Sequence, residues 1–230
     1  MQSLGVDTIV QAFPRLLDGF GLTIQIAGIS FLLSVPFGFA IGVFMSLKNK
    51  WLTFTLRILL DAFRLIHPLI WLFILFYGIA YLFHAPTDGY YIAIIVFSLW
   101  GSFEMGDLVR SFMASLPRHQ FETSMAIGLT RRQMYMHVLL PQIVIRTTPS
   151  IVNLATRLIK TTSLVSLIGV QEMLKVAQSI IQVTYYNNPT SMIPFTMYLL
   201  LLILYFIICF PLSVLSRFIE KKISSLTAAT

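Results

Sequence analysis

Charged residues are scarce in this chain. Only 11% of its 230 residues are Asp, Glu, Lys or Arg, whereas 57% are hydrophobic, and the mean hydropathy is +0.83. Because soluble domains carry roughly 25% charged residues, this composition excludes an ordinary soluble domain and predicts a membrane protein. Nothing indicates a separate soluble part, so residues 1–230 are interpreted as a single transmembrane domain.

The chain also lacks the residues that several kinds of site require. Its one cysteine, Cys209, lies within an apolar run, which excludes a disulfide or a cysteine-based metal framework. No His, Cys or carboxylate spacing is typical of a metal site. There is no Gly-x4-Gly-Lys-Ser/Thr phosphate loop for ATP. We therefore expect no cofactor in this chain.

Long apolar runs predict an all-α fold with about five transmembrane helices. A bilayer core requires ~20 apolar residues in a helix. Gly38 and Gly42 form a pair of small residues four apart, which predicts close helix packing in the first span. The five predicted spans are residues 20–47, 54–83, 91–113, 143–159 and 193–215, of which the fourth is the most polar.

Lys and Arg residues are concentrated after the first, third and fifth spans, with Lys50, Arg132 and Lys221 among them. The alternate connections, residues 84–89 and 185–189, are poor in both. By the positive-inside rule, the N-terminus is predicted outside and the C-terminus in the cytoplasm. The same distribution accounts for the net charge of +7 and argues against nucleic-acid binding.

Local rules predict a helix, a turn and a second helix between the third and fourth spans. Pro117 ends the third span, and a short helix is expected from about residue 120, with Glu122 in its first turn, where the helix dipole stabilises a carboxylate. Gly128 is expected to end this helix in a left-handed conformation.

The second short helix is predicted to begin with a capping box formed by Thr130 and Gln133. Pro141 should end or kink it. Taken alone, these features also fit an amphipathic helix on the membrane surface, with apolar residues such as Phe121 in contact with lipid.

The spacing of this segment resembles the coupling loop of bacterial ABC-importer permeases, E-A-A-x3-G-x9-I-x-L-P, which binds the ATPase subunits. Val138 stands in place of the Ile, and small residues replace the two alanines. By this resemblance the coupling loop spans residues 117–141. Its ATPase-contacting positions are Glu122, Thr123, Ser124, Ala126, Gly128, Leu140 and Pro141.

The resemblance covers about 200 residues, far more than a short motif, and is strongest to the polar amino-acid subfamily (histidine, glutamine, arginine and cystine permeases). Asp107 and Arg110 match its A-E-x-x-R pattern, with Asp in place of Glu. Downstream, Lys160 to Ser166 and the following Ile-Gly-Val match K-D-T-S-L-V-S-x-I-G-V, with Thr161 in place of the Asp.

This resemblance implies the transmembrane subunit of a type I ABC importer for amino acids, in the bacterial cytoplasmic membrane and in contact with its lipid. Such a subunit pairs with a second permease, identical or homologous. It also works with ATPase subunits that bind ATP and Mg²⁺, and with an extracytoplasmic solute-binding protein that delivers the substrate. The chain itself is not expected to be an enzyme.

Charged residues inside spans are costly and usually face protein or water. Glu104, Asp107 and Arg110 recur every three residues, within roughly 120° of one helix face, and could form an ion-pair network. Alternatively, Glu104 could bind a substrate ammonium, or it could pair with Arg64 or Arg157. Arg157 could likewise hold a substrate carboxylate.

Polar residues 160–163, at the end of the fourth span, could either line a transport path or satisfy the backbone of a broken helix. His67, beside Pro68, fits a hydrogen-bonded packing residue better than a ligand. The full predicted substrate path consists of Arg64, Glu104, Asp107, Arg157, Lys160, Thr161, Thr162 and Ser163.

Three alternatives are open at this point. The chain could be an importer permease for another small solute. It could be a small integral-membrane enzyme, for which Glu104 and Asp107 are the only paired carboxylates available. It could also be a stand-alone channel, although the polar loop between the third and fourth spans would then have no purpose.

Overall fold

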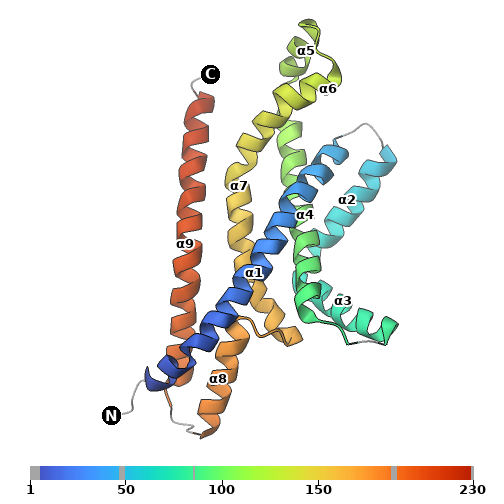
Figure 1. The fold of residues 1–230 in the computed structure, drawn as a ribbon. Helices are drawn as coiled ribbons and strands as arrows, with labels where there is room; N and C mark the ends of the chain where they lie inside the picture. The colour runs from blue at the N-terminus through green and yellow to red at the C-terminus, as the bar shows by residue number, and fades with distance from the viewer. Residues whose placement is uncertain (1–5, 47–49, 85, 188–190, 229–230) are drawn as a thin grey trace.

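The computed structural model describes residues 6–46, 50–84, 86–187 and 191–228, and nearly all of these are helical (Figure 1). The helices run mostly along one long axis, and α5 and α6 form a tip at one end (Figure 1). The elements are α1 (Val6–Met45), α2 (Lys50–Leu65), α3 (Pro68–Phe83), α4 (Gly89–Ser115), α5 (Arg118–Ala126), α6 (Arg131–Gln133), the π-helical turn η1 (Met134–Leu139), α7 (Leu140–Thr161), the 3₁₀ segment η2 (Thr162–Ile168), α8 (Met173–Asn187) and α9 (Ile193–Ala228).

Four helical stretches of the described residues are long and apolar enough to cross a bilayer: Thr8–Met45, Gly89–Ser115, Met134–Ile168 and Ile193–Ser225. α2 and α3 pass the same test as a pair, bent by 101° at a short break. Counting this pair as one span gives the predicted five. α1 begins at the opposite end of the molecule from the end of α9, as an odd number of spans requires (Figure 1).

Two predicted bounds differ from the structure by more than ten residues, and one helix was missed. The first span begins at Val6 rather than at residue 20, whereas its predicted end, residue 47, lies outside the described residues. The last span continues to Ala228 rather than 215, because the helix extends beyond the apolar run. α8, at Met173–Asn187, was not predicted, since it is too short and too polar to read as a span.

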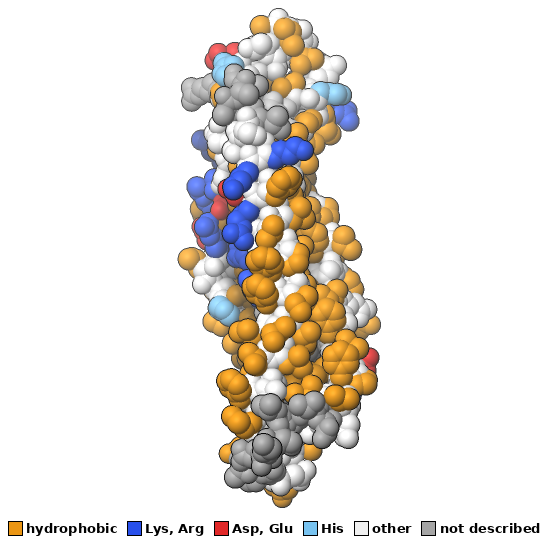
Figure 2. Space-filling view, turned by 90° about the vertical axis from the view of Figure 1, so that its left-hand side faces the viewer, with side chains coloured by type: hydrophobic (Ala, Val, Ile, Leu, Met, Phe, Trp, Pro, Cys, Tyr) orange, Lys and Arg blue, Asp and Glu red, His pale blue; other side chains and the backbone are white. Residues whose placement is uncertain are grey.

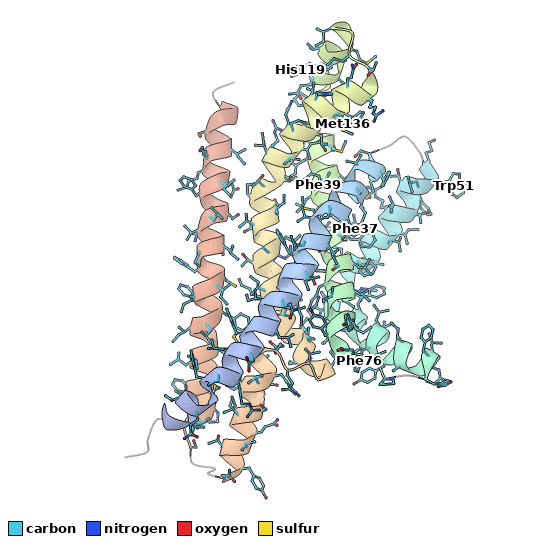
Figure 3. All side chains as sticks on the ribbon, in the orientation of Figure 1. Phe37, Phe39, Trp51, Phe76, His119 and Met136 are labelled. Carbon is cyan, nitrogen blue, oxygen red and sulfur yellow. The ribbon has the colours of Figure 1, made fainter. Side chains whose placement is uncertain are left out.

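Lys and Arg side chains gather in the upper half of the face drawn in Figure 2, toward the end that carries α5. Hydrophobic side chains cover most of the rest of that face. Figure 3 gives two landmarks along the same axis: His119 lies at the α5 tip, and Phe76 on α3 lies toward the other end. On this face the basic side chains therefore lie nearer the α5 end, and hydrophobic side chains predominate below them.

α1 packs most extensively against α4. Gly38 and Gly42 bring the two helices together: a Cβ at Gly38 would overlap the Met105 side chain, and one at Gly42 would overlap Val109. The predicted close packing of this pair is confirmed, and α4 supplies a small residue of its own, Gly106, which meets α1.

A buried carboxylate, Glu172, joins α1 to α8. Its side chain accepts a hydrogen bond of 2.9 Å from the Lys175 N–H and lies 3.3 Å from the Thr23 hydroxyl of α1. The Met173 N–H in turn donates to that hydroxyl over 3.2 Å. Burial raises the pKa of this carboxyl, which lies outside the membrane-spanning stretches. Sequence reasoning missed Glu172 because nothing local marks its distant partner.

We expect Gly42→Val to separate α1 from α4 and to destabilise the protein by roughly 1–3 kcal/mol, as overpacking does in a tight interface. The matched control is Gly28→Val in the same helix, where an added Cβ meets nothing within 4 Å. Thermal unfolding in detergent, followed by size-exclusion chromatography, compares the two variants. Equal melting temperatures would contradict the packing role of Gly42.

Candidate functional site

A cavity of about 660 Å³ lies where three elements meet. The α2–α3 break contributes Arg64 and His67, α4 contributes Trp100 and Glu104, and α7 with the start of η2 contributes the remaining polar residues. Glu104 lies slightly past the middle of α4 (Gly89–Ser115), so the cavity borders the middle of a spanning helix. The complete lining is Arg64, Leu65, His67, Pro68, Trp100, Glu104, Arg157, Lys160, Thr161, Ser163 and Leu164.

The break between α2 and α3 follows from Pro68. A proline restricts the preceding residue to extended backbone, and His67 has φ −61° and ψ 137°. The His67 side chain then caps α3, because its Nδ1 accepts a hydrogen bond of 3.3 Å from the Leu69 N–H. His67 is therefore a hydrogen-bonded structural residue, as predicted, and the predicted single second span is bent rather than straight.

Aromatic stacking holds this break against α4. The Phe63 ring of α2 stacks on Trp71 of α3 at 4.4 Å and on Phe103 of α4 at 4.9 Å between ring centroids. One buried ring therefore ties all three helices together beside the cavity. Offset stacking of this kind adds to the free energy of burial.

Glu104 pairs with Arg157 rather than with Arg64. The two terminal guanidinium nitrogens of Arg157, Nη1 and Nη2, donate to the two carboxylate oxygens of Glu104 over 2.6 and 3.1 Å. The same guanidinium lies 5.0 Å from the centre of the Trp100 ring, a cation–π contact. A bidentate pair and an aromatic face fix Arg157 in one orientation toward the cavity.

Asp107 holds a second set of charges together. It accepts from Arg64 over 2.8 Å and from Arg110, on its own helix, over 2.7 Å. The network that was one of the predicted alternatives is thus present, but it is split into two sets. Both carboxylates of the enzyme alternative, Glu104 and Asp107, are engaged by arginines, which leaves neither as a free general base.

The hydroxyl residues at the end of α7 satisfy the backbone. Thr161 donates to the Arg157 carbonyl over 2.8 Å, and Ser163 donates to the Lys160 carbonyl over 2.9 Å. Thr162 is fully buried and donates to the Ile159 carbonyl over 2.7 Å. These bonds stabilise the change from α-helix to the 3₁₀ segment η2.

The structure brings six of the eight predicted path residues to the cavity. Asp107 stands behind Arg64 as its ion-pair partner, and Thr162 points into the protein core. Trp100 was missed, although its position four residues before Glu104 places it on the same helix face. The six that line the cavity are Arg64, Glu104, Arg157, Lys160, Thr161 and Ser163.

The tip at residues 117–141 has the predicted turn. Gly128 has φ +82°, and the Leu129 N–H donates to the Ser124 carbonyl over 3.1 Å, which is the Schellman closure of α5. The predicted capping box is present: the Thr130 N–H donates to the Gln133 side chain over 2.9 Å, and the Gln133 N–H donates to the Thr130 hydroxyl over 3.4 Å.

One detail of this tip was predicted wrongly: α5 begins at Arg118, two residues early, so Glu122 lies beyond its first turn. Of the two alternatives for Pro141, ending the second helix is excluded, because that helix continues from α6 through η1 into α7. The Leu140 N–H instead donates to the Tyr135 carbonyl, and this wider turn places Pro141 in the first turn of α7, where its missing N–H is tolerated.

The predicted coupling residues differ in exposure. Ser124 is buried and donates to the Gln120 carbonyl over 2.7 Å, so it stabilises α5 from within. Leu140 is half-buried. The apolar side chains of Met125 and Ile127, with exposed fractions of 58% and 70%, lie among the exposed residues of the loop. The predicted coupling residues that are exposed are Glu122, Thr123, Ala126, Gly128 and Pro141.

Broken spanning helices around a charged mid-membrane cavity are typical of transport permeases. Comparison with known proteins gives the same class. The chain matches the family described as "Binding-protein-dependent transport system inner membrane component" over residues 34–225. It therefore belongs to this family, the permease subunits of ABC importers. It is a multi-pass protein of the bacterial cytoplasmic membrane, and ATP hydrolysis lies in a partner subunit.

Individual relatives cover nearly the whole chain. The L-cystine transport system permease protein TcyB of Bacillus subtilis (strain 168) is 30% identical over 96% of this chain and 92% of its own length. The probable amino-acid ABC transporter permease protein YckA of the same organism is 29% identical over 93% and 91%.

Solved structures show the same fold. One titled as an amino acid ABC transporter with histidines aligns with a TM-score of 0.81 at 20% identity, covering 93% of this chain and 96% of that one. An inward-facing structure of the MetNI methionine ABC transporter aligns with a TM-score of 0.65 at 21% identity, covering 90% and 97%. The type I importer permease fold is thereby established.

We expect Glu104→Gln and Arg157→Met to be individually destabilising, because each leaves an unpaired charge in a spanning helix. The double variant should recover most of the lost stability, with a coupling free energy of about 1 kcal/mol for a partly exposed pair. Thermal unfolding of the unmodified protein, the two single variants and the double variant measures this coupling in a double-mutant cycle. Glu104→Gln combined with Arg217→Gln on α9 is the control for additivity, and additive losses for the first pair would refute the coupling.

Proposed function

We propose that this permease forms part of the substrate path of an ATP-driven amino-acid importer, with the 660 Å³ cavity as the site where substrate passes. The observation that carries this proposal is the Glu104–Arg157 pair. It presents a carboxylate and a guanidinium side by side at mid-span, and these groups complement the ammonium and carboxylate of an amino acid. The amino-acid and L-cystine permeases among the relatives support the same substrate class.

The exposed tip is the surface proposed to bind the ATPase. Met125 and Ile127 present apolar side chains there, and Glu122 and Thr123 lie in the same short helix. A convex helix of this kind can insert into a cleft of a partner. ATP and Mg²⁺ would then be bound by that partner alone.

An uninterrupted helical path connects the tip to the cavity. Residues 131–168 run through α6, η1, α7 and η2 without a break, and Arg157 and Lys160 lie near the far end of this path. A displacement of the tip by closing ATPase subunits would be carried along α7 to these two side chains. This is a structural basis for alternating access, the exposure of the path first to one side of the membrane and then to the other.

The remaining partners follow from the importer class. A second permease, identical or homologous, would complete the path, and an extracytoplasmic solute-binding protein would deliver the substrate. The tip and the end of α9 would face the cytoplasm, because basic side chains gather toward that end of the molecule (Figure 2). The beginning of α1 would face outward.

The test is ATP hydrolysis by the complex reconstituted from this permease and the ATPase and binding protein encoded beside it, across a panel of amino acids. Stimulation by one or a few of them is the expected result. A flat response from an intact complex would overturn the amino-acid assignment in favour of another small solute. Failure of any ATPase to associate would overturn the assignment of the tip.

We expect Gly128→Val to uncouple transport, because φ +82° is costly for a β-branched residue. ATP-driven uptake should fall at least about tenfold, the factor that corresponds to roughly 1.4 kcal/mol. Gly128→Asn is the matched control, since Asn tolerates the left-handed conformation. Uptake by proteoliposomes is compared with the amount of ATPase that copurifies. Normal uptake by the valine variant would show that the turn is not required.

A further inference from the structure

The charges around the cavity do not balance. Three cationic side chains line it, those of Arg64, Arg157 and Lys160, against one carboxylate, that of Glu104. Asp107 adds a second carboxylate behind Arg64, but it also binds Arg110. Taken together, this cluster contains four cationic side chains and two carboxylates, a surplus of two positive charges.

Both carboxylates are already committed to arginines. Glu104 uses both oxygens on Arg157, and Asp107 uses one on Arg64 and the other on Arg110. Within the described part of the chain, Lys160 has no carboxylate oxygen within 4.0 Å. Lys160 is therefore an exposed, uncompensated ammonium on the wall of the cavity.

An uncompensated charge in a spanning segment is unfavourable wherever lipid or a partner subunit shields it from water, because a low dielectric disfavours an isolated ion. A bound group of negative charge would lower this cost. A basic ligand would increase it, and a ligand without net charge would leave it unchanged. The electrostatics of the cavity therefore distinguish amino acids by their side-chain charge.

The geometry supplies two separate anion positions. Lys160 follows Arg157 by three residues on α7, so the two side chains share a helix face with their Cβ atoms about 5–6 Å apart. A guanidinium has five N–H donors, and the Glu104 pair takes two of those on Arg157. The remaining N–H groups of Arg157 and the ammonium of Lys160 can each donate to one carboxylate of a short dicarboxylic molecule.

We propose that the substrate of this permease is an amino acid with a second carboxylate, carrying a net negative charge. One carboxylate binds Arg157, the other binds Lys160, and the ammonium faces Glu104. This inference rests on the proposed amino-acid function and narrows it to one class. The competing explanation is that a carboxylate of the second permease neutralises the surplus positive charge, in which case no acidic substrate is needed.

The experiment uses the complete complex, purified from membranes through a tag on this chain and placed in lipid nanodiscs. Equilibrium binding is measured for L-aspartate and L-glutamate and for their amides, L-asparagine and L-glutamine, with L-lysine as the basic probe. Each acid differs from its amide by one charge at nearly constant shape. We expect one of the acids to bind at least about tenfold more tightly than its amide, and L-lysine to bind most weakly.

Lys160→Gln should weaken binding of the acid at least about tenfold more than binding of its amide, and Lys160→Arg should retain the preference for the acid. Lys221→Gln, on exposed α9, is the matched control for loss of a lysine. Size-exclusion profiles of each complex verify assembly. The conservative Lys160→Arg variant keeps the test informative if the glutamine variant fails to assemble.

The outcomes separate this inference from the proposed function. If an amide or L-lysine binds more tightly than the acids, or if Lys160→Gln weakens acids and amides equally, the acidic class is refuted and the amino-acid importer stands. If no amino acid binds while a different solute stimulates ATP hydrolysis, the amino-acid function itself is refuted.

Discussion

Inside a bilayer the backbone has no water to bond with, so each N–H and C=O must find its partner within the protein. Regular α-helix meets this constraint along most of the described spans, which depart from it at three places. The break before Pro68 is capped by the His67 ring, the 3₁₀ segment η2 is stabilised by the Thr162 and Ser163 hydroxyls, and η1 shifts its hydrogen bond to the Leu140–Tyr135 pair. Each departure from α-helix is accompanied by its own local compensation.

These departures from α-helix lie at the cavity and at the tip, the two proposed functional sites. The break before Pro68 and the start of η2 both border the cavity, and η1 adjoins the tip. Irregular backbone is what allows polar side chains to converge at mid-membrane depth, because a straight helix would direct them along one face only. The close glycine contact of α1 with α4 then fixes α4, and with it Trp100 and Glu104, in place.

The charge arrangement connects stability with function. Pairing Glu104 with Arg157, and Asp107 with two arginines, allows five charged groups to lie in and beside the spans at a moderate cost. The pairing is incomplete, since Lys160 remains exposed without a carboxylate partner in the described residues. This residue beside the cavity is the basis of the proposed preference for an acidic substrate.

Features that depend on neighbouring residues could be predicted accurately. The Gly128 turn and the Thr130–Gln133 capping box are decided within a few residues, and both were placed correctly. The errors at the same tip are also instructive. Pro141 does not stop its helix, because the preceding turn widens and moves the proline to a tolerated position. Proline's intrinsic propensity indicates only that it is unfavourable inside a helix. The geometry of the preceding π-helical turn then decides how this chain accommodates Pro141.

The sequence by itself determined the membrane class, the number of spans, the turn at Gly128 and the set of charged residues in the spans, because hydropathy and capping act over short distances. Only the tertiary structure decided the partners: Glu104 meets Arg157, 53 residues away, while Arg64 meets Asp107. It also decided the 101° bend, the burial of Thr162 and the role of Glu172. These depend on which helix faces meet, which is fixed by packing across the whole bundle rather than by any local pattern.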